Sequence, residues 1–250
     1  MSKRWRSFKA EFSKYLLEVS CYYPDQIVGI VVLFIMFFGF FSLSSGGTKD
    51  ASYYIGFVFW FYANGIIATS SVSISDEKQM GTFEQLLIKP TGLSTILFYR
   101  SICWLILQTI EIVAIMLIIK VVFRVPMAFS LGIIPVFLVT MLGLVGISYI
   151  LSALTLLFTK TASFGSIFSY VLLFFTGVIS GTNTTENFGY YVLPLAQGIR
   201  LSRDVVTKQL ISVPSILFLI LNSALYLIAG VLIFYFVMRK AKSKGISQKY

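Results

Sequence analysis

Residues 75–90 read SDEKQMGTFEQLLIKP and form the most polar interruption in the first half of an otherwise apolar chain. Their apolar side chains recur every three or four positions, which predicts a helix over 76–88 with one narrow apolar stripe. The apolar residues of this stripe are Met80, Phe83, Leu86 and Leu87. Thr82 and Gln85 have the spacing of a capping box, in which the two side chains satisfy backbone N–H groups of the first turn. Pro90 disfavours helical geometry at the preceding residue and marks the end of this helix.

The composition of the chain places it in a membrane. Of its 250 residues, 57% are apolar and 12% are charged, whereas soluble domains are about half apolar and about a quarter charged. Several continuous apolar runs approach or exceed the roughly 20 residues that a helix needs to cross a bilayer, and a β-barrel would instead show short alternating segments. We therefore expect an all-α polytopic membrane protein, with one transmembrane domain over residues 1–250. Its six predicted spans cover 26–43, 53–74, 94–122, 131–158, 162–180 and 213–238.

The charge and the rare residue types exclude several functions. The net charge is +10, from 20 Lys and Arg against 10 Asp and Glu, and it gathers at the two termini beside apolar spans. Anionic lipid and membrane topology explain this placement better than nucleic acid, so no nucleic-acid partner is expected. The chain has no His, which excludes histidine metal sites and Ser-His triads. Cys21 and Cys103 lie near predicted cytoplasmic span ends and are expected to be reduced.

Residues 4–23 alternate aromatic and basic side chains at helical spacing, and Pro24 is expected to end the helix. An aromatic face opposite a basic face is typical of a helix that lies in the membrane interface. A helix packed on the cytoplasmic side of the protein itself would give the same pattern, and both interpretations stay open.

The distribution of Lys and Arg predicts the orientation. If both termini are cytoplasmic, only a few of the basic residues fall on the opposite side, as the positive-inside rule requires. Those residues are Lys49, Lys120, Arg124, Arg200, Arg203 and Lys208. The chain is therefore expected to be a multi-pass plasma-membrane protein with 76–88 in the cytoplasm and 181–211 on the extracytoplasmic side. The segment 181–211 is amphipathic and too polar to cross, and Arg200, Asp204 and Lys208 are spaced for i,i+4 ion pairs on a helix.

Polar and small residues inside the spans are expected to face protein or water rather than lipid. Asn64 begins a polar half of the second span, which predicts either interhelical hydrogen bonds or the lining of a pathway. In the third span Trp104, Gln108 and Glu111 share one face. An intramembrane carboxylate indicates a functional site, a structural pairing with a neighbouring helix, or exposure to an outer vestibule, and the sequence does not decide between them. Small residues in the fourth span predict a close helix contact: Gly143, Gly146, Ser148 and Ser152.

The cytoplasmic stretch and its place in the span order resemble the permeases of ABC-2 type ABC transporters. In that family the loop between spans two and three reads roughly acidic-basic-x-x-Gly-Thr-x-Glu-x-Leu and ends in Pro. The matching residues here are Glu77, Lys78, Gly81, Thr82, Glu84, Leu86 and Pro90. Residues 175–178 (FTGV) and 193–195 (LPL), followed by Arg200, agree as well. Lys89 departs from the family, whose members often carry a small hydroxyl residue before the Pro.

The resemblance implies the subunit of a bacterial exporter that moves an amphipathic drug, peptide, lipid or glycolipid. Two permease subunits, identical or different, would form the pathway, and each would engage a separate cytoplasmic ATPase that carries ATP and Mg²⁺. On this resemblance the permease would bind no cofactor, would not be an enzyme and would have no catalytic or metal-binding residues. The chain lacks a Gly-x-x-x-x-Gly-Lys-Ser/Thr motif.

The resemblance also assigns roles to residues. The 76–88 helix would be the coupling helix, seated on the ATPase through Glu77, Met80, Gly81, Thr82, Phe83, Glu84, Gln85 and Leu87. The pathway candidates are Asn64, Trp104, Gln108 and Glu111. The segment 181–211 would be a re-entrant helical element that closes an outer gate, with Gly177, Pro194 and Arg200 as candidates.

Two other functions compete with this one. The first is an ATPase-independent channel or secondary transporter that uses Glu111 as an ion or proton site, although no internal repeat supports a repeat-based transporter. The second is an intramembrane enzyme, which the missing His and the missing pair of acidic residues disfavour.

Overall fold

The computed structural model describes residues 3–43, 51–89, 91–123, 130–158, 162–178, 191–207 and 212–243, and these residues form helices joined by short turns, without a strand. The all-α prediction is confirmed for this part of the chain. Pro90, the loop after the first span, residues 179–190 and residues 208–211 lie outside the described residues. The last two predicted residues of the fifth span and much of the 181–211 segment fall there.

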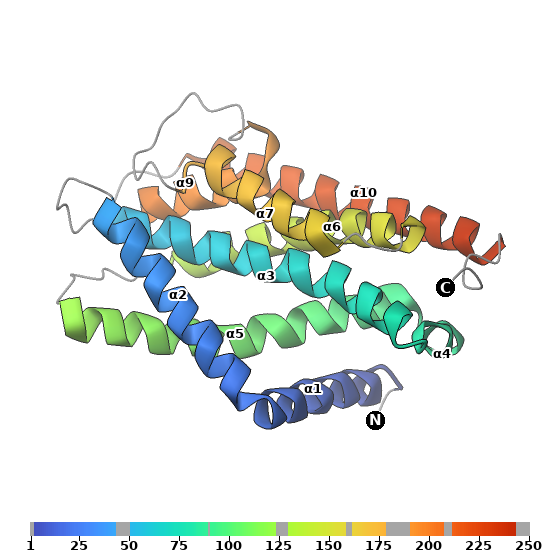
Figure 1. Cartoon of the computed structure of the whole chain (residues 1–250). Coiled ribbons are helices and arrows are strands. Elements are labelled where there is room, and N and C mark those ends of the chain that lie inside the picture. Colours follow the sequence, from blue (N-terminus) through green and yellow to red (C-terminus); the bar gives the residue numbers. More distant parts are fainter. Residues whose placement is uncertain are drawn as a thin grey trace.

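The described elements follow one another along the chain as Figure 1 shows. They are α1 (Lys3–Cys21), α2 (Tyr23–Leu43), α3 (Ala51–Gln79), α4 (Phe83–Ile88), α5 (Leu93–Phe123), α6 (Ile133–Leu157), α7 (Ala162–Phe175), α9 (Pro194–Val206) and α10 (Val213–Ser243). In the described residues, α3, α5, α6 and α10 are long and apolar enough to cross a membrane. The apolar part of α2, Ile27–Gly39, is shorter than these four helices. The 14 residues of α7 span about 21 Å, less than a bilayer core of about 30 Å. Four of the six predicted spans are thus supported by length and composition, and the other two stay predictions.

Helix α6 lies at the centre of the packing, with α10, α3 and α9 around it. Its contact with α10 is close enough to bring the two backbones together at one point. Gly146 of α6 faces Gly230 of α10, and the Cα of Gly146 would lie 3.0 Å from a Cβ added at Gly230. A side chain at either position would overlap the other helix. This confirms the close helix contact that the small residues of the fourth span predict.

The polar second half of α3 takes part in interhelical hydrogen bonds. The Ser70 hydroxyl donates to Ser148 Oγ at 3.2 Å and lies 3.4 Å from Ser101 Oγ, so it joins α3, α6 and α5. Ser71, by contrast, donates to the Ile67 carbonyl of its own helix at 3.0 Å. The prediction that these polar residues form interhelical hydrogen bonds is therefore confirmed for Ser70.

The boundary between α1 and α2 differs from the prediction. α1 ends at Cys21 and α2 already begins at Tyr23, so Pro24 lies in the first turn of α2 rather than ending the preceding helix. The first helical turn has backbone N–H groups without intrahelical partners, and a proline that lacks this group is therefore tolerated there. The chain changes direction at the single turn residue Tyr22.

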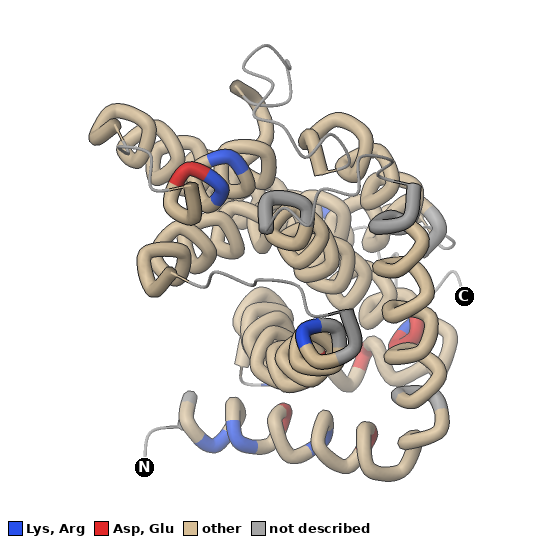
Figure 2. The backbone as a smooth tube through the Cα atoms, turned by 90° about the vertical axis from the view of Figure 1, so that its left-hand side faces the viewer, with Lys and Arg blue, Asp and Glu red and all other residues tan. Residues whose placement is uncertain are grey.

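The two ends of the bundle carry different elements. α1, α4 and the C-terminal end of α10 lie at one end, and α9 lies at the other (Figure 1). Figure 2 shows charged residues on α1 and α9, while long stretches of the helices between them carry none. These two ends hold the two groups of predicted site residues outside the spans.

Candidate functional site

The segment that joins α3 to α5 is divided by a turn. α3 continues to Gln79, and α4 begins only at Phe83. Gly81 has φ of +69°, which L side chains rarely adopt, and it allows the reversal between the two helices. The prediction of one helix over 76–88 is therefore wrong in its middle, because the second span extends by a full turn beyond residue 74 and then breaks at the glycine.

The Thr82 side chain does not form the predicted capping box. Its hydroxyl lies 2.5 Å from Glu77 Oε2 and 3.3 Å from the Glu77 carbonyl, and it makes no cap bond to α4. Gln85 is exposed. A hydrogen bond to a carboxylate is about twice as strong as one between neutral groups, so Glu77 takes the hydroxyl that the cap would need.

Glu77 belongs to a group of charges around a buried arginine that the sequence analysis missed. Arg100 of α5 is only 4% exposed. Its Nη2 lies 2.8 Å from Glu77 Oε1 of α3, and its Nε lies 3.2 Å from Glu11 Oε2 of α1. Lys14 lies 3.8 Å from Glu77 and Lys89 lies 3.9 Å from Glu11. We call Glu11, Lys14, Glu77, Lys89 and Arg100 the ionic cluster. Within the sequence, the only signal was a single arginine inside the apolar run that becomes α5.

The ionic cluster fixes α1 against the rest of the fold, and neighbouring contacts support it. The Phe8 ring meets Tyr99 of α5 edge to face, with 5.6 Å between the centroids. The hydroxyls of Ser7 and Thr91 are 3.2 Å apart. Burial raises the pKa of the Tyr15 phenol well above its usual range, so this side chain stays neutral. α1 therefore packs on its own protein, while its location in the membrane interface stays a prediction.

Lys78 connects the same segment to α6. Its Nζ donates to the carbonyls of Thr155 at 2.8 Å and Leu156 at 3.1 Å, in the last turn of that helix. Carbonyls there lack intrahelical partners, and an ammonium group satisfies them. The same Nζ lies 5.7 Å from the centre of the Phe83 ring. The residues at the end of α3 thus contact α1, α5 and α6 at once.

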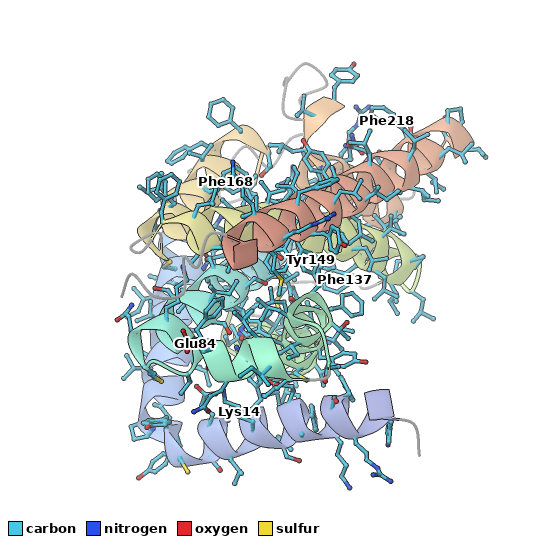
Figure 3. All side chains as sticks on the ribbon, turned by 90° about the vertical axis from the view of Figure 1, so that its right-hand side faces the viewer. Lys14, Glu84, Phe137, Tyr149, Phe168 and Phe218 are labelled. Atoms are coloured by element: carbon cyan, nitrogen blue, oxygen red, sulfur yellow. The ribbon has the colours of Figure 1, made fainter. Side chains whose placement is uncertain are left out.

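The outward side of the α3–α4 segment carries unburied apolar side chains. Met80 is 76% exposed and Ile88 is 82% exposed. Glu84 and Gln85 are exposed between them, and Figure 3 shows Glu84 on α4 at the end of the bundle where Lys14 of α1 also lies. We call Met80, Gly81, Glu84, Gln85 and Ile88 the α4 surface.

Three apolar residues of α4 face the protein instead. Leu86 is buried, and Phe83 and Leu87 pack partly buried against the core. The predicted apolar stripe is therefore used mainly within the chain. Ile88, which the sequence analysis did not select, is the large apolar residue that α4 leaves to the outside.

At the opposite end, α9 closes over the end of α7. Arg203 is buried, and its Nη1 donates to the Gly177 carbonyl at 3.1 Å while its Nη2 lies 3.4 Å from the Val178 carbonyl. Gly177 has φ of +71° and turns the chain at this point. Pro194 begins α9 and packs on Gly143 of α6. Arg200, the arginine selected from the sequence, is only half-buried, so Arg203 is the buried arginine that the sequence analysis did not select.

The 13 residues of α9 span about 20 Å, which is too short to cross a bilayer. The helix packs against α6, α3 and α10. This agrees with the expectation that the segment does not cross, and its re-entrant character stays a prediction.

The pathway candidates of α5 lie together on one face. Gln108 Nε2 donates to Glu111 Oε2 at 2.7 Å. The Trp104 ring packs on Gly65 of α3, where a Cβ would overlap it. Asn64 is half-buried and lies one residue, or about 100° around the helix, from Gly65, so α3 directs it to a different side.

Comparison with known protein families identifies the family of this chain. The family model described as ABC-2 type transporter matches residues 4–207, from α1 to the end of α9. No curated protein matches the chain.

Proposed function

Because the chain belongs to the ABC-2 type transporter family, whose model covers most of its length, we propose that it is the permease subunit of an exporter driven by a separate cytoplasmic ATPase. The resemblance seen in the sequence is confirmed by this match. As a multi-pass membrane transport domain the chain supplies the route across the membrane. ATP and Mg²⁺ would bind to the partner ATPase and not to this chain.

The proposed topology has six crossings, with α2 and α7 completing the four long apolar helices. α1, α4 and the end of α10 lie at one end of the bundle, so a cytoplasmic assignment of this end would place both termini and α4 in the cytoplasm. The distribution of Lys and Arg supports that assignment. α9 then lies on the extracytoplasmic side, where it would close an outer gate over Gly177.

The observation that carries the proposal is the α4 surface. Exposed apolar side chains that together form one patch outside the membrane are typical of protein contact sites, and Met80 and Ile88 would form such a patch. Met80 and Ile88 would enter an apolar groove of the ATPase, and Glu84 would form a charged contact at its rim. Because the inner side of the same segment contacts α1, α5 and α6, a movement of the ATPase would be transmitted to all three helices.

The test is co-purification of the permease with the ATPase when the two are expressed together in membranes. We expect Met80→Asp and Ile88→Asp to abolish co-purification and ATP-dependent export, because each places a carboxylate in the apolar centre of the contact. Both residues are exposed in the free chain, so the amount of folded protein in the membrane should not change. Phe83→Asp would be a poorer test, since Phe83 packs partly against the core of its own chain.

Leu131→Asp is the matched control, because Leu131 is as exposed as Met80 but lies just before α6, at the opposite end of the bundle. This variant should retain the ATPase. Retention of the ATPase and of export in both Met80→Asp and Ile88→Asp would refute the docking role of the α4 surface.

A complete pathway would require a second permease subunit, identical or different, with membrane lipids around the pair. Trp104, Gln108 and Glu111 are the candidates for its lining, because they bring polar groups together within an apolar helix. Asn64 remains a candidate from the sequence.

A further inference from the structure

Helix α9 buries polar side chains that lack hydrogen-bond partners. Gln197 is 1% exposed, and within the part of the chain that the structure describes neither its amide oxygen nor its amide nitrogen has a partner. Among the same residues, the hydroxyls of Ser202 on α9 and Ser223 on α10 are also buried without a partner. Nearly all buried polar groups in folded proteins are hydrogen-bonded, so these exceptions at one helix need a physical explanation.

The unpartnered side chains lie where α9 meets α6 and α10. A Cβ added at Gly143 of α6 would lie 3.0 Å from Pro194 Cβ of α9 and 3.0 Å from Ser223 Oγ of α10, so the three helices meet at this glycine. One turn after Pro194, Gly198 lies so close to α6 that a Cβ would overlap a side chain of that helix. Ser202 follows another turn later and continues the same row.

Gln197 lies on the side of α9 that faces both neighbouring helices. It follows Pro194 by three positions and precedes Leu201 by four, and residues at these spacings are neighbours on a helix surface. Leu201 forms a buried apolar cluster with Val136 of α6 and Leu219 of α10. The amide of Gln197 is therefore enclosed between helices and away from water.

Other contacts hold α9 in this position. Leu195 and Ile199 are buried in the main core of the protein. Arg203 donates to the Gly177 carbonyl at 3.1 Å. Arg203 lies near the C-terminal end of α9 and Gln197 lies in its N-terminal half. The arginine therefore anchors one end of the helix, while the unpartnered amide opposes the burial of the other end.

The burial of an unpartnered amide costs free energy, because the group gives up its hydrogen bonds to water and gains none in exchange. A position of α9 that exposes Gln197 recovers those bonds but loses apolar contacts with α6 and α10. Opposing contributions of this kind allow a packed element to have two discrete positions.

We propose that α9 is a hinged lid with a second position, in which its N-terminal half moves away from α6 and α10 and Gln197 is hydrated. Arg203 is the pivot, and Gln197 is a positioning residue that favours the open position. This inference rests on the proposed function in one respect, since it explains how the proposed outer gate opens. The movement of the lid itself requires neither the ATPase nor a substrate.

The test measures the reaction of a thiol placed under α9 with a small, charged methanethiosulfonate, in the purified chain in phospholipid nanodiscs. Ser223→Cys introduces this thiol in a Cys21→Ser background. Cys103 stays in place as an internal reference, because it is fully buried on α5, and mass spectrometry of peptides separates the two labelled sites. The introduced thiol reacts only when α9 moves away, so we expect it to be labelled faster than Cys103.

The decisive variant is Gln197→Met, which keeps an unbranched side chain of similar size but needs no hydrogen bond. We expect it to slow labelling of the introduced thiol by about tenfold or more, because the closed position no longer buries an unpartnered amide. The labelling rate of Cys103 should not change.

Ser152→Ala is the matched control. It removes another buried hydroxyl that has no partner among the described residues. Ser152 lies nine positions after Gly143 and therefore about 14 Å further along α6, away from the contact with α9. Ser152→Ala should leave the labelling of the introduced thiol unchanged.

Three results would overturn the proposal. A thiol from Ser223→Cys that is labelled no faster than Cys103 would refute the second position. An unchanged rate in Gln197→Met would show that the amide is satisfied in the closed position, for example by a bound water. Equal slowing of Cys103 would mean that Gln197→Met stabilises the whole fold rather than closing the lid.

Two further measures keep the result interpretable. If Ser223→Cys does not accumulate in the membrane, Ser202→Cys on α9 gives the same measurement, because Ser202 is also fully buried. The ATPase co-purification test is separate: retained ATPase without lid movement would refute the lid alone, and the converse would refute the coupling alone.

Discussion

Replacing Arg100 by Gln should loosen the end of the bundle that carries α1 and α4. The substitution leaves two carboxylates, Glu11 and Glu77, with side chains only 10% and 14% exposed and without their central cation. Removal of one partner from a buried ion pair typically costs about 3–5 kcal/mol. Lys14 and Lys89 contact the same carboxylates, but about half of each lysine side chain is exposed, and such pairs contribute at most about 1 kcal/mol. They cannot replace Arg100.

Cys103 provides the assay for this prediction. It is fully buried and lies one turn from Arg100 on α5. In a Cys21→Ser background, a maleimide reaches the Cys103 thiol only when this region opens. A loss of about 3–5 kcal/mol corresponds to a labelling rate that is roughly 100- to 4,000-fold higher. A rate equal to that of the unsubstituted chain would refute the stabilising role of the ionic cluster.

A second set of variants separates charge from packing. Adding Glu11→Gln and Glu77→Gln to Arg100→Gln removes the unpaired carboxylates, so part of the protection of Cys103 should return. If the triple variant labels as fast as Arg100→Gln alone, lost packing rather than unpaired charge causes the opening, and the electrostatic reasoning is wrong.

Two further predictions concern helix packing, and thermal denaturation of the purified protein measures both. Gly146→Ala should lower the stability of the protein by about 1–3 kcal/mol, because it overpacks the α6–α10 contact. The control is Gly39→Ala, which has open space around it and should not destabilise the protein. Equal melting temperatures of the two variants would contradict the close contact. Arg203→Gln should cost about 1–3 kcal/mol because it removes the charged donor from buried carbonyls at the end of α7. Arg200→Gln, on the half-buried side of the same helix, should have a smaller effect, and the reverse order would show that Arg200 is the structural arginine.

Local patterns in the sequence predicted the features that depend on neighbouring residues. The apolar runs predicted the all-α membrane fold, and the motif around Gly81 and Thr82 predicted the ABC-2 family that residues 4–207 match. Gly143 and Gly146 predicted a close helix contact because a missing side chain has few other uses within a span. These inferences need only composition, order and spacing.

Other local predictions failed where another contact competed with them. Thr82 has the spacing of a capping residue, yet its hydroxyl bonds the Glu77 carboxylate, which the end of α3 brings within 2.5 Å. Phe83 and Leu87 form the predicted stripe, but the stripe packs on the core of the chain itself, and Met80 and Ile88 remain outside. A helical pattern shows that a face is apolar, and it does not show which partner covers that face.

The ionic cluster depends on the tertiary structure alone. Arg100 meets Glu11 across 89 positions of sequence and Glu77 across 23. The sequence by itself determined that the chain is a helical membrane transporter with an acidic residue inside one span. Only the packing of the helices decided which charges neutralise one another, because burial and distance, not spacing along the chain, set the energy of a charge.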